Sequence, residues 1–238
     1  MKFAVIGDIH GNKYALMAVL NDINLRNIDF IVSTGDLVGY FPFSNEVISI
    51  IKNHKVLVVK GNHDEVIANG TKTDSSILDN LSDAELVANA SRLYINSTIT
   101  DENRLFLANL PTSLNLSCGK FNIKFVHGSP FKINEYLYED DILLSQIADK
   151  IDENVIVCGH THLAYHKEIN GTHFINCGSV GKPKHGNSDS SYAVVDIKGD
   201  SLTTDIIKVS YNLSPLINDI KSNNMISDSL ISNLLEGK

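Results

Sequence analysis

Residues 2–11 are KFAVIGDIHG, an apolar run of strand type that ends directly before Asp8 and His10. Successive side chains on a strand point to opposite faces, so residues two apart point the same way. We therefore expect Asp8 and His10 to reach one point in space. Beyond this stretch, residues 12–26 carry apolar side chains at spacings of three and four, which is typical of an amphipathic helix.

The rest of the first third continues the alternation of strand and helix. Residues 29–33 and 55–59 are short apolar runs of strand type, and residues 45–53 between them have a helical pattern. Strands that alternate with helices predict βαβ units and a largely parallel sheet in this part of the chain.

Residues 65–110 have a different pattern. Helices are predicted at 84–93 and 101–110, with Thr100 as the N-cap of the second, and polar stretches separate them. Pro111 ends the segment. We expect a helical insertion that covers one edge of the core.

The second half of the chain is rich in strands. One helix is predicted at 140–151, with acidic residues in its first turn, where the helix dipole favours them. Gly119 and the pair Gly199-Asp200 mark expected hairpin turns. The predicted strands lie at 113–118, 121–126, 155–158, 165–169, 173–176, 192–197 and 202–209.

The C-terminal tail follows this strand-rich part. We expect one domain over residues 1–212 and a helical tail over 213–238, formed by two short amphipathic helices broken near Asn223-Asn224. The apolar stripe of this tail either packs on the chain's own core or forms a contact in a homodimer.

Composition excludes several classes of protein. The formal charge is −8, which argues against binding to nucleic acid or anionic membranes through bulk charge. Three cysteines without a CxxC spacing favour reduced thiols. The apolar run before Asp8 is too short for a signal peptide, and no stretch reaches the 18 or so apolar residues that span a bilayer. A soluble, cytoplasmic protein is expected.

Five short polar clusters each follow a predicted strand, where ligands bind in open α/β sheets. Mixed oxygen and imidazole donors suit Mn, Fe, Zn or Ni. Seven such groups are too many for one ion, so two ions that share a carboxylate are the simplest arrangement. The clusters are Asp8-Ile9-His10, Gly35-Asp36-Leu37-Val38-Gly39, Gly61-Asn62-His63-Asp64, His127-Gly128 and Gly159-His160-Thr161-His162.

Each cluster alone has an ordinary structural explanation. A Gly-Asp pair after a strand is often a turn, His127 alone is more often a packed histidine, and Asp64 either caps the following helix or orients a site histidine. The joint occurrence of all five clusters in this order favours a metal site.

Together the clusters resemble the signature of the calcineurin-like metallophosphoesterase superfamily: D-x-H, G-D, G-N-H-D/E, a later H and G-H-x-H. The resemblance covers residues 1 to about 210. Gly7 to Asn12, Gly35 to Tyr40 and Gly178-Ser179-Val180-Gly181 resemble its compact bacterial and archaeal phosphodiesterase-like branch. The resemblance implies an α/β fold, a four-layer αββα sandwich of two mixed β-sheets flanked by helices.

The resemblance also implies two divalent transition metals, with a bridging hydroxide as nucleophile and His63 protonating the leaving oxygen. Asp36 would bridge the two ions. The first metal would be held by Asp8, His10, Asp36 and His162, and the second by Asp36, Asn62, His127 and His160.

The chain departs from some branches of the family. Ser/Thr protein phosphatases and dinucleoside tetraphosphate hydrolases have arginines in the segments where this chain has Gly39-Tyr40 and Lys60. Cys177 replaces a usual proline, and Lys182 or Lys184 stands where an arginine often follows. These lysines either contact a phosphate or are solvated loop residues.

A phosphodiesterase acting on small or nucleotide-like esters is therefore expected. The alternatives are a phosphomonoesterase of a small metabolite, a nuclease subunit, and a non-catalytic scaffold such as the retromer subunit of this superfamily. The acidic balance weighs against a nuclease, and the retention of all seven ligands together with His63 weighs against a scaffold.

Overall fold

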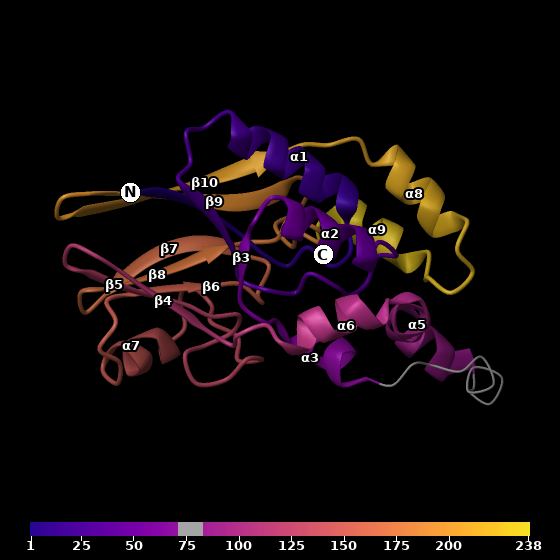
Figure 1. The fold of residues 1–238 in the computed structure, drawn as a ribbon, viewed down its shortest axis with the longest axis horizontal. Helices are drawn as coiled ribbons and strands as arrows, with labels where there is room; N and C mark the ends of the chain where they lie inside the picture. Colours follow the sequence, from indigo (N-terminus) through magenta and orange to yellow (C-terminus); the bar gives the residue numbers. More distant parts are fainter. Residues whose placement is uncertain (71–82) are drawn as a thin grey trace.

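The computed structural model describes residues 1–70 and 83–238. Two sheets pack face to face, and helices cover their outer faces (Figure 1). The strands are β1 (Lys2–Ile6), β2 (Phe30–Ser33), β3 (Leu57–Val58), β4 (Leu114–Cys118), β5 (Phe121–Phe125), β6 (Val155–Cys158), β7 (Ala164–Ile169), β8 (Thr172–Cys177), β9 (Ser190–Lys198) and β10 (Ser201–Val209). The helices are α1 (Lys13–Asn24), α2 (Ser44–Asn53), α3 (Asn62–Asn69), α5 (Asp83–Thr98), α6 (Asp101–Ala108), α7 (Leu143–Ala148), α8 (Ser214–Lys221) and α9 (Ser229–Glu236).

Both sheets are mixed. The first has the strand order β10-β9-β1-β2-β3, in which β1, β2 and β3 are parallel and β9 and β10 are antiparallel to their neighbours. The second has the order β4-β5-β6-β8-β7, with a parallel centre of β5, β6 and β8 and an antiparallel strand at each edge. The predicted fold class, two mixed sheets flanked by helices, is confirmed.

Strand β1 shows how the alternation of side chains builds the layers. Phe3 and Val5 are fully buried between the two sheets, and the ring centroid of Phe3 lies 5.7 Å from that of Phe125 in the second sheet. Ala4 and Ile6 point to the opposite face, where they pack with α1 and α2. A strand buried on both faces needs the unbroken apolar run seen in residues 3–6.

The helix ends follow capping chemistry. The Asn12 side chain accepts a hydrogen bond from Ala15 N and so caps α1. The predicted cap of α6 is confirmed, because Thr100 Oγ1 accepts from Asn103 N at 3.2 Å. These side chains satisfy backbone donors that have no partner within a helix.

Helix α7 is shorter than the predicted 140–151. It begins at Leu143, and the Asp141 side chain accepts a hydrogen bond from Leu143 N at 2.9 Å. The acidic residues therefore precede the helix, and the prediction that they occupy its first turn was wrong. Asp141 favours this because its side chain competes for nearby backbone donors.

Helices α3, α5, α6, α8 and α9 lie toward the end of the molecule opposite the β9–β10 hairpin (Figure 1). Leu216, Ile220, Leu230 and Leu234 of α8 and α9 are buried and pack around Phe41. The expected insertion over 65–110 includes residues 71–82, which lie outside the described residues. Within residues 1–70 and 83–238, every helix is too short or too polar to cross a lipid bilayer.

Candidate metal centre

All eight predicted site residues lie near one another, just beyond the carboxyl ends of β1, β2, β3, β5 and β6. The parallel strands of both sheets end at this same edge, so the loops that follow them meet there. The residues are Asp8, His10, Asp36, Asn62, His63, His127, His160 and His162.

Asp8 and His10 meet for a reason other than the predicted one. Strand β1 ends at Ile6, and strand alternation therefore does not apply to them. Instead Asp8 and His10 adopt left-handed backbone conformations, with φ of 50° and 53°. Asp36, His160 and His162 do the same, with φ of 54°, 66° and 63°. Asp and His tolerate this region better than most residues, but each such position still costs roughly 1–3 kcal/mol.

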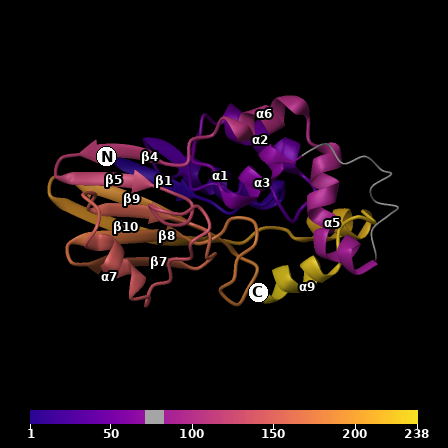
Figure 2. The same ribbon diagram turned by 90° about the horizontal axis from the view of Figure 1, so that it is seen from below.

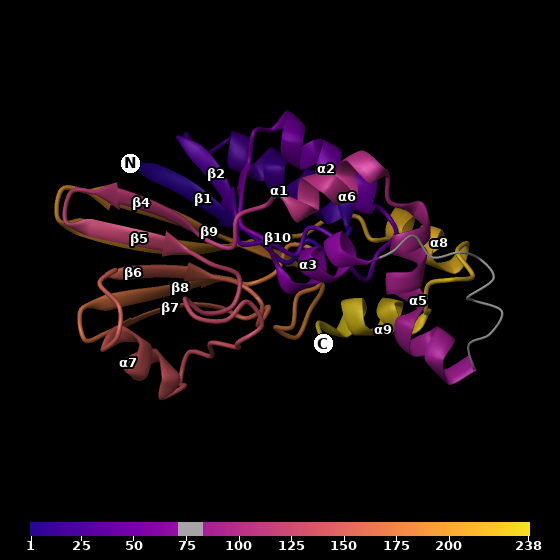
Figure 3. The ribbon, with the colours of Figure 1, turned by 60° about the horizontal axis from the view of Figure 1, so that its bottom comes forward.

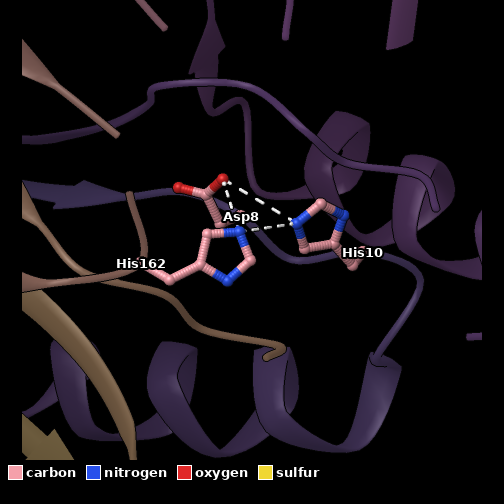
Figure 4. Close-up of side chains that lie close together, drawn as sticks. All are labelled: Asp8, His10 and His162. Carbon is pink, nitrogen blue, oxygen red and sulfur yellow. Dashed lines mark hydrogen bonds and ion pairs between the residues drawn. The ribbon is translucent and has the colours of Figure 1, made fainter. Parts of the chain in front are cut away.

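Asp8, His10 and His162 form the first cluster (Figure 4). His10 Nε2 lies 3.1 Å from His162 Nε2, and Asp8 Oδ1 lies 3.3 Å from His162 Nε2 and 3.8 Å from His10 Nε2. All three side chains are buried and converge on one point.

The tautomers of these histidines follow from their second hydrogen bonds. His10 Nδ1 lies 3.2 Å from the carbonyl of Val38, and His162 Nδ1 lies 2.5 Å from that of Lys182. A carbonyl only accepts, so each Nδ1 carries a proton, and a ring in its neutral form has its lone pair on Nε2. The two lone pairs face each other beside Asp8 Oδ1, which has no hydrogen-bond partner in the described part of the chain. A divalent cation fits this arrangement of three donors.

Asp36, His127 and His160 form the second cluster, to which Asn62 is adjacent. His127 Nε2 lies 2.9 Å from Asn62 Oδ1, 3.2 Å from His160 Nδ1 and 3.4 Å from Asp36 Oδ2. His127 Nδ1 lies 2.8 Å from the carbonyl of Thr34, which again directs Nε2 toward the other donors.

Asp36 joins the two clusters. Its Oδ2 lies 3.7 Å from His10 Nε2 and 3.4 Å from His127 Nε2, while its Oδ1 accepts a hydrogen bond from His63 N at 2.9 Å. Burial raises the pKa of Asp36, but His127 and His10 oppose this and bring the pKa well below its usual range. The carboxyl is therefore ionised and lies between the two groups of imidazoles.

The histidines differ in their affinity for protons. Burial lowers the pKa of His10 well below its ordinary value and, with the charge of His127, lowers that of His160 to about 4. Burial also lowers the pKa of His127, but the neighbouring Asp36 outweighs it and raises the pKa to about 9. His10 and His160 are thus neutral and ready to ligate at pH 7, whereas a cation competes with a proton at His127.

Comparison with known proteins agrees with this geometry. Residues 1–200 match the family model described as the calcineurin-like phosphoesterase superfamily domain. The chain belongs to this superfamily. It is 31% identical to an uncharacterised protein of Methanocaldococcus jannaschii, over 93% of each chain.

Solved structures support the assignment. A metallophosphoesterase from Sphaerobacter thermophilus is 26% identical with a TM-score of 0.80, covering 100% of this chain and 99% of that one. A hypothetical protein from Pyrococcus horikoshii is 25% identical with a TM-score of 0.87, covering 100% and 98%. The chain is therefore a phosphoester hydrolase with grouped His and Asp side chains suited to divalent metals.

His63 of this phosphoesterase lies at the edge of the metal centre. It is the second residue of α3, and its ring centroid is 4.9 Å from that of His10. Gly39, with φ of +120°, allows this packing, since a Cβ there would lie 2.7 Å from His63 Nδ1 and 2.9 Å from His10 Nδ1. His63 is half-buried, unlike His10, and so lies nearer to solvent.

Asp64 of the phosphoesterase caps a helix, as one of its two predicted roles required. Its Oδ2 accepts from Gly61 N at 3.0 Å, and its Oδ1 accepts from Leu37 N and Val38 N at 2.9 and 3.2 Å. The same carboxyl thus ties the loop after β2 to the start of α3, which fixes Asp36 beside Asn62.

Two aromatic residues near the centre were missed by sequence reasoning. The ring of Tyr136 stacks on His160 with centroids 4.0 Å apart, and the ring centroid of Tyr40 lies 5.0 Å from that of His63. Tyr40 falls within a quoted motif, but Tyr136 lies in a loop without a recognisable pattern. Lys182 contributes its carbonyl to His162, and its ammonium donates to the carbonyl of Lys238 at 2.8 Å.

Proposed function

We propose that this phosphoesterase is a two-metal phosphodiesterase for small or nucleotide-like substrates. The observation that carries the proposal is the position of Asp36 Oδ2, within 3.7 Å of a ligating nitrogen in the first cluster and 3.4 Å of one in the second. The first ion would be held by Asp8, His10, Asp36 and His162, and the second by Asp36, Asn62, His127 and His160.

The side chains of the centre have distinct roles in this proposal. Mn, Fe, Zn or Ni ions bound here would neutralise phosphoryl charge and lower the pKa of water. The backbone carbonyls of Val38, Lys182 and Thr34 hold the three histidines in the tautomer that ligates. His63, half-buried at the edge of the centre, would donate a proton to the leaving oxygen.

The surroundings of the centre support a diester substrate. A phosphate monoester carries one more negative charge than a diester, and related phosphatases meet it with arginines. Lys60 stands in the segment where one of these arginines is expected, but its ammonium donates to the carbonyl of Ala108 at 2.8 Å. Lys182 is likewise directed at Lys238. The formal charge of −8 further favours small esters over nucleic acid.

The test compares two aryl esters at equal Mn²⁺ loading. We expect kcat/KM to be higher for bis(p-nitrophenyl) phosphate than for p-nitrophenyl phosphate. Asp36→Asn keeps the size of the side chain but removes its charge, and it should abolish turnover of both esters. A tenfold preference for the monoester, about 1.4 kcal/mol in the transition state, would replace this proposal with a small-molecule phosphatase.

A further inference from the structure

A pocket of about 400 Å³ opens beside His63 and is bounded by α3, α5 and α9. Helices α5 and α9 lie side by side at this end of the molecule in two views (Figures 2 and 3). Among the side chains that the structure describes, those of the metal clusters come from neither helix. The pocket is large enough for an organic group the size of a nucleoside.

The walls of this pocket differ in chemistry. Val66, Ile95 and Leu230 supply an apolar wall, and Ile95 and Leu230 are buried. Polar groups on α5 and near the start of α9 supply the other wall, including Ser229 and Arg92. Arg92 and His63 are the basic residues among the described residues that line the pocket, and no carboxylate is among them.

Asn62 and His63 line both this pocket and the metal centre. A phosphoester whose phosphoryl group lies at the centre must direct at least one organic arm away from it. The pocket offers such an arm an apolar surface to cover and, at Arg92, a cation. An Arg92 amino nitrogen donates to Asn89 Oδ1 at 2.7 Å, which holds the guanidinium on the pocket wall.

We propose that this pocket binds a nucleoside-sized arm of the substrate and that Arg92 binds a second anionic group on that arm. Guanidinium groups bind phosphate and carboxylate with paired, charge-assisted hydrogen bonds. Because no carboxylate is among the described residues that line the pocket, the guanidinium of Arg92 favours an anionic arm over a neutral one. The inference rests on the proposed function, because it takes the phosphoryl group to lie at the centre.

The experiment compares two ligands that differ by one phosphate. Thymidine 3′,5′-bisphosphate and thymidine 5′-monophosphate are titrated by calorimetry into the Mn²⁺-loaded protein. We expect the bisphosphate to bind about tenfold more tightly than the monophosphate, because one additional charge-assisted hydrogen bond gives a gain in affinity of about this size. Arg92→Gln should bring the two affinities within about twofold, and Arg92→Lys should restore part of the difference.

A matched control separates this contact from the general field of the protein. Lys198→Gln removes one positive charge from an exposed side chain at the far β9–β10 hairpin and should leave the preference unchanged (Figure 1). Turnover of bis(p-nitrophenyl) phosphate should also stay within about twofold in Lys198→Gln.

The outcomes distinguish the two proposals. Equal affinities in the wild type, or a preference that survives in Arg92→Gln, overturn the role of the pocket and Arg92. If bis(p-nitrophenyl) phosphate is hydrolysed in either of those cases, the proposed function stands without this inference. If bis(p-nitrophenyl) phosphate is not hydrolysed, the proposed function fails. The titrations then still show whether Arg92 binds the second phosphate of the bisphosphate.

Discussion

Binding of Mn²⁺ at pH 7.5 should release one proton from His127. Asp36 and the carbonyl of Thr34 overcome burial and raise the pKa of His127 to about 9, so its ring is about 97% protonated at this pH. The ring must be neutral to ligate. The apparent affinity at the second cluster should therefore be about 30-fold below its limiting value, and should rise about tenfold per pH unit up to pH 9.

The same linkage affects folding. Because the pKa of folded His127 lies above the unfolded value, its proton stabilises the folded chain fully below about pH 6.5. That contribution, about 3 kcal/mol, is lost as the pH rises through 9. His160, with a pKa of about 4, adds no proton release at pH 7.5.

Calorimetry in buffers with different heats of ionisation measures the number of protons released. We expect about one proton at pH 7.5 and about a quarter of a proton at pH 9.5, where His127 is largely neutral. His127→Gln should remove this release. A release that stays constant between the two pH values, or that persists in His127→Gln, would show that the proton comes from another group and would refute the reasoning.

Three further predictions follow from the site and the core. His63→Ala should keep its bound metal and lose about 10²–10⁴-fold in turnover, whereas Asp36→Ala should lose its bound metal as well as its turnover. Metal analysis and kinetics measure the two effects. Equal loss of metal in the two variants would make His63 a ligand. Chelation should lower the melting temperature and abolish hydrolysis. Mn²⁺ at 100 times its Kd should raise the free energy of unfolding by about 2.7 kcal/mol. A melting temperature that is the same with and without metal would contradict the site. Leu234→Ala should lower the free energy of unfolding in urea by about 2–5 kcal/mol, because Leu234 is fully buried in the cluster around Phe41. The control Leu235→Ala, at a half-exposed neighbour, should lower it much less. Equal losses would mean that α9 does not pack on the cluster around Phe41.

The elements and the site composition could be predicted because they depend on local pattern. The strand of residues 155–158 was predicted exactly, and the cap at Thr100 follows from its side chain alone. Helix α7 was predicted too long because the competition of Asp141 for Leu143 N is a local choice that periodicity does not report.

The geometry within the site could not be predicted, since it depends on contacts between residues far apart in the sequence. The tautomer of His127 depends on Thr34, which lies 93 positions earlier in the chain. The stacking of Tyr136 on His160 depends on a loop without a motif. Asp8 and His10 were rightly expected to meet, but through strand alternation rather than through left-handed turns.

Those left-handed turns set stability against function. Glycine adopts positive φ without strain, so exchanging His10 or His162 for glycine relaxes the backbone and removes a donor at once. In such a variant the relief of backbone strain, roughly 1–3 kcal/mol, is opposed by the packing that is lost with a buried ring. Five of the nine non-glycine residues with positive φ in the described part of the chain are candidate metal ligands: Asp8, His10, Asp36, His160 and His162. The backbone strain at these positions accompanies the side chains that build the centre, so a variant of this protein selected for thermostability should be checked for activity before its melting temperature is counted as an improvement.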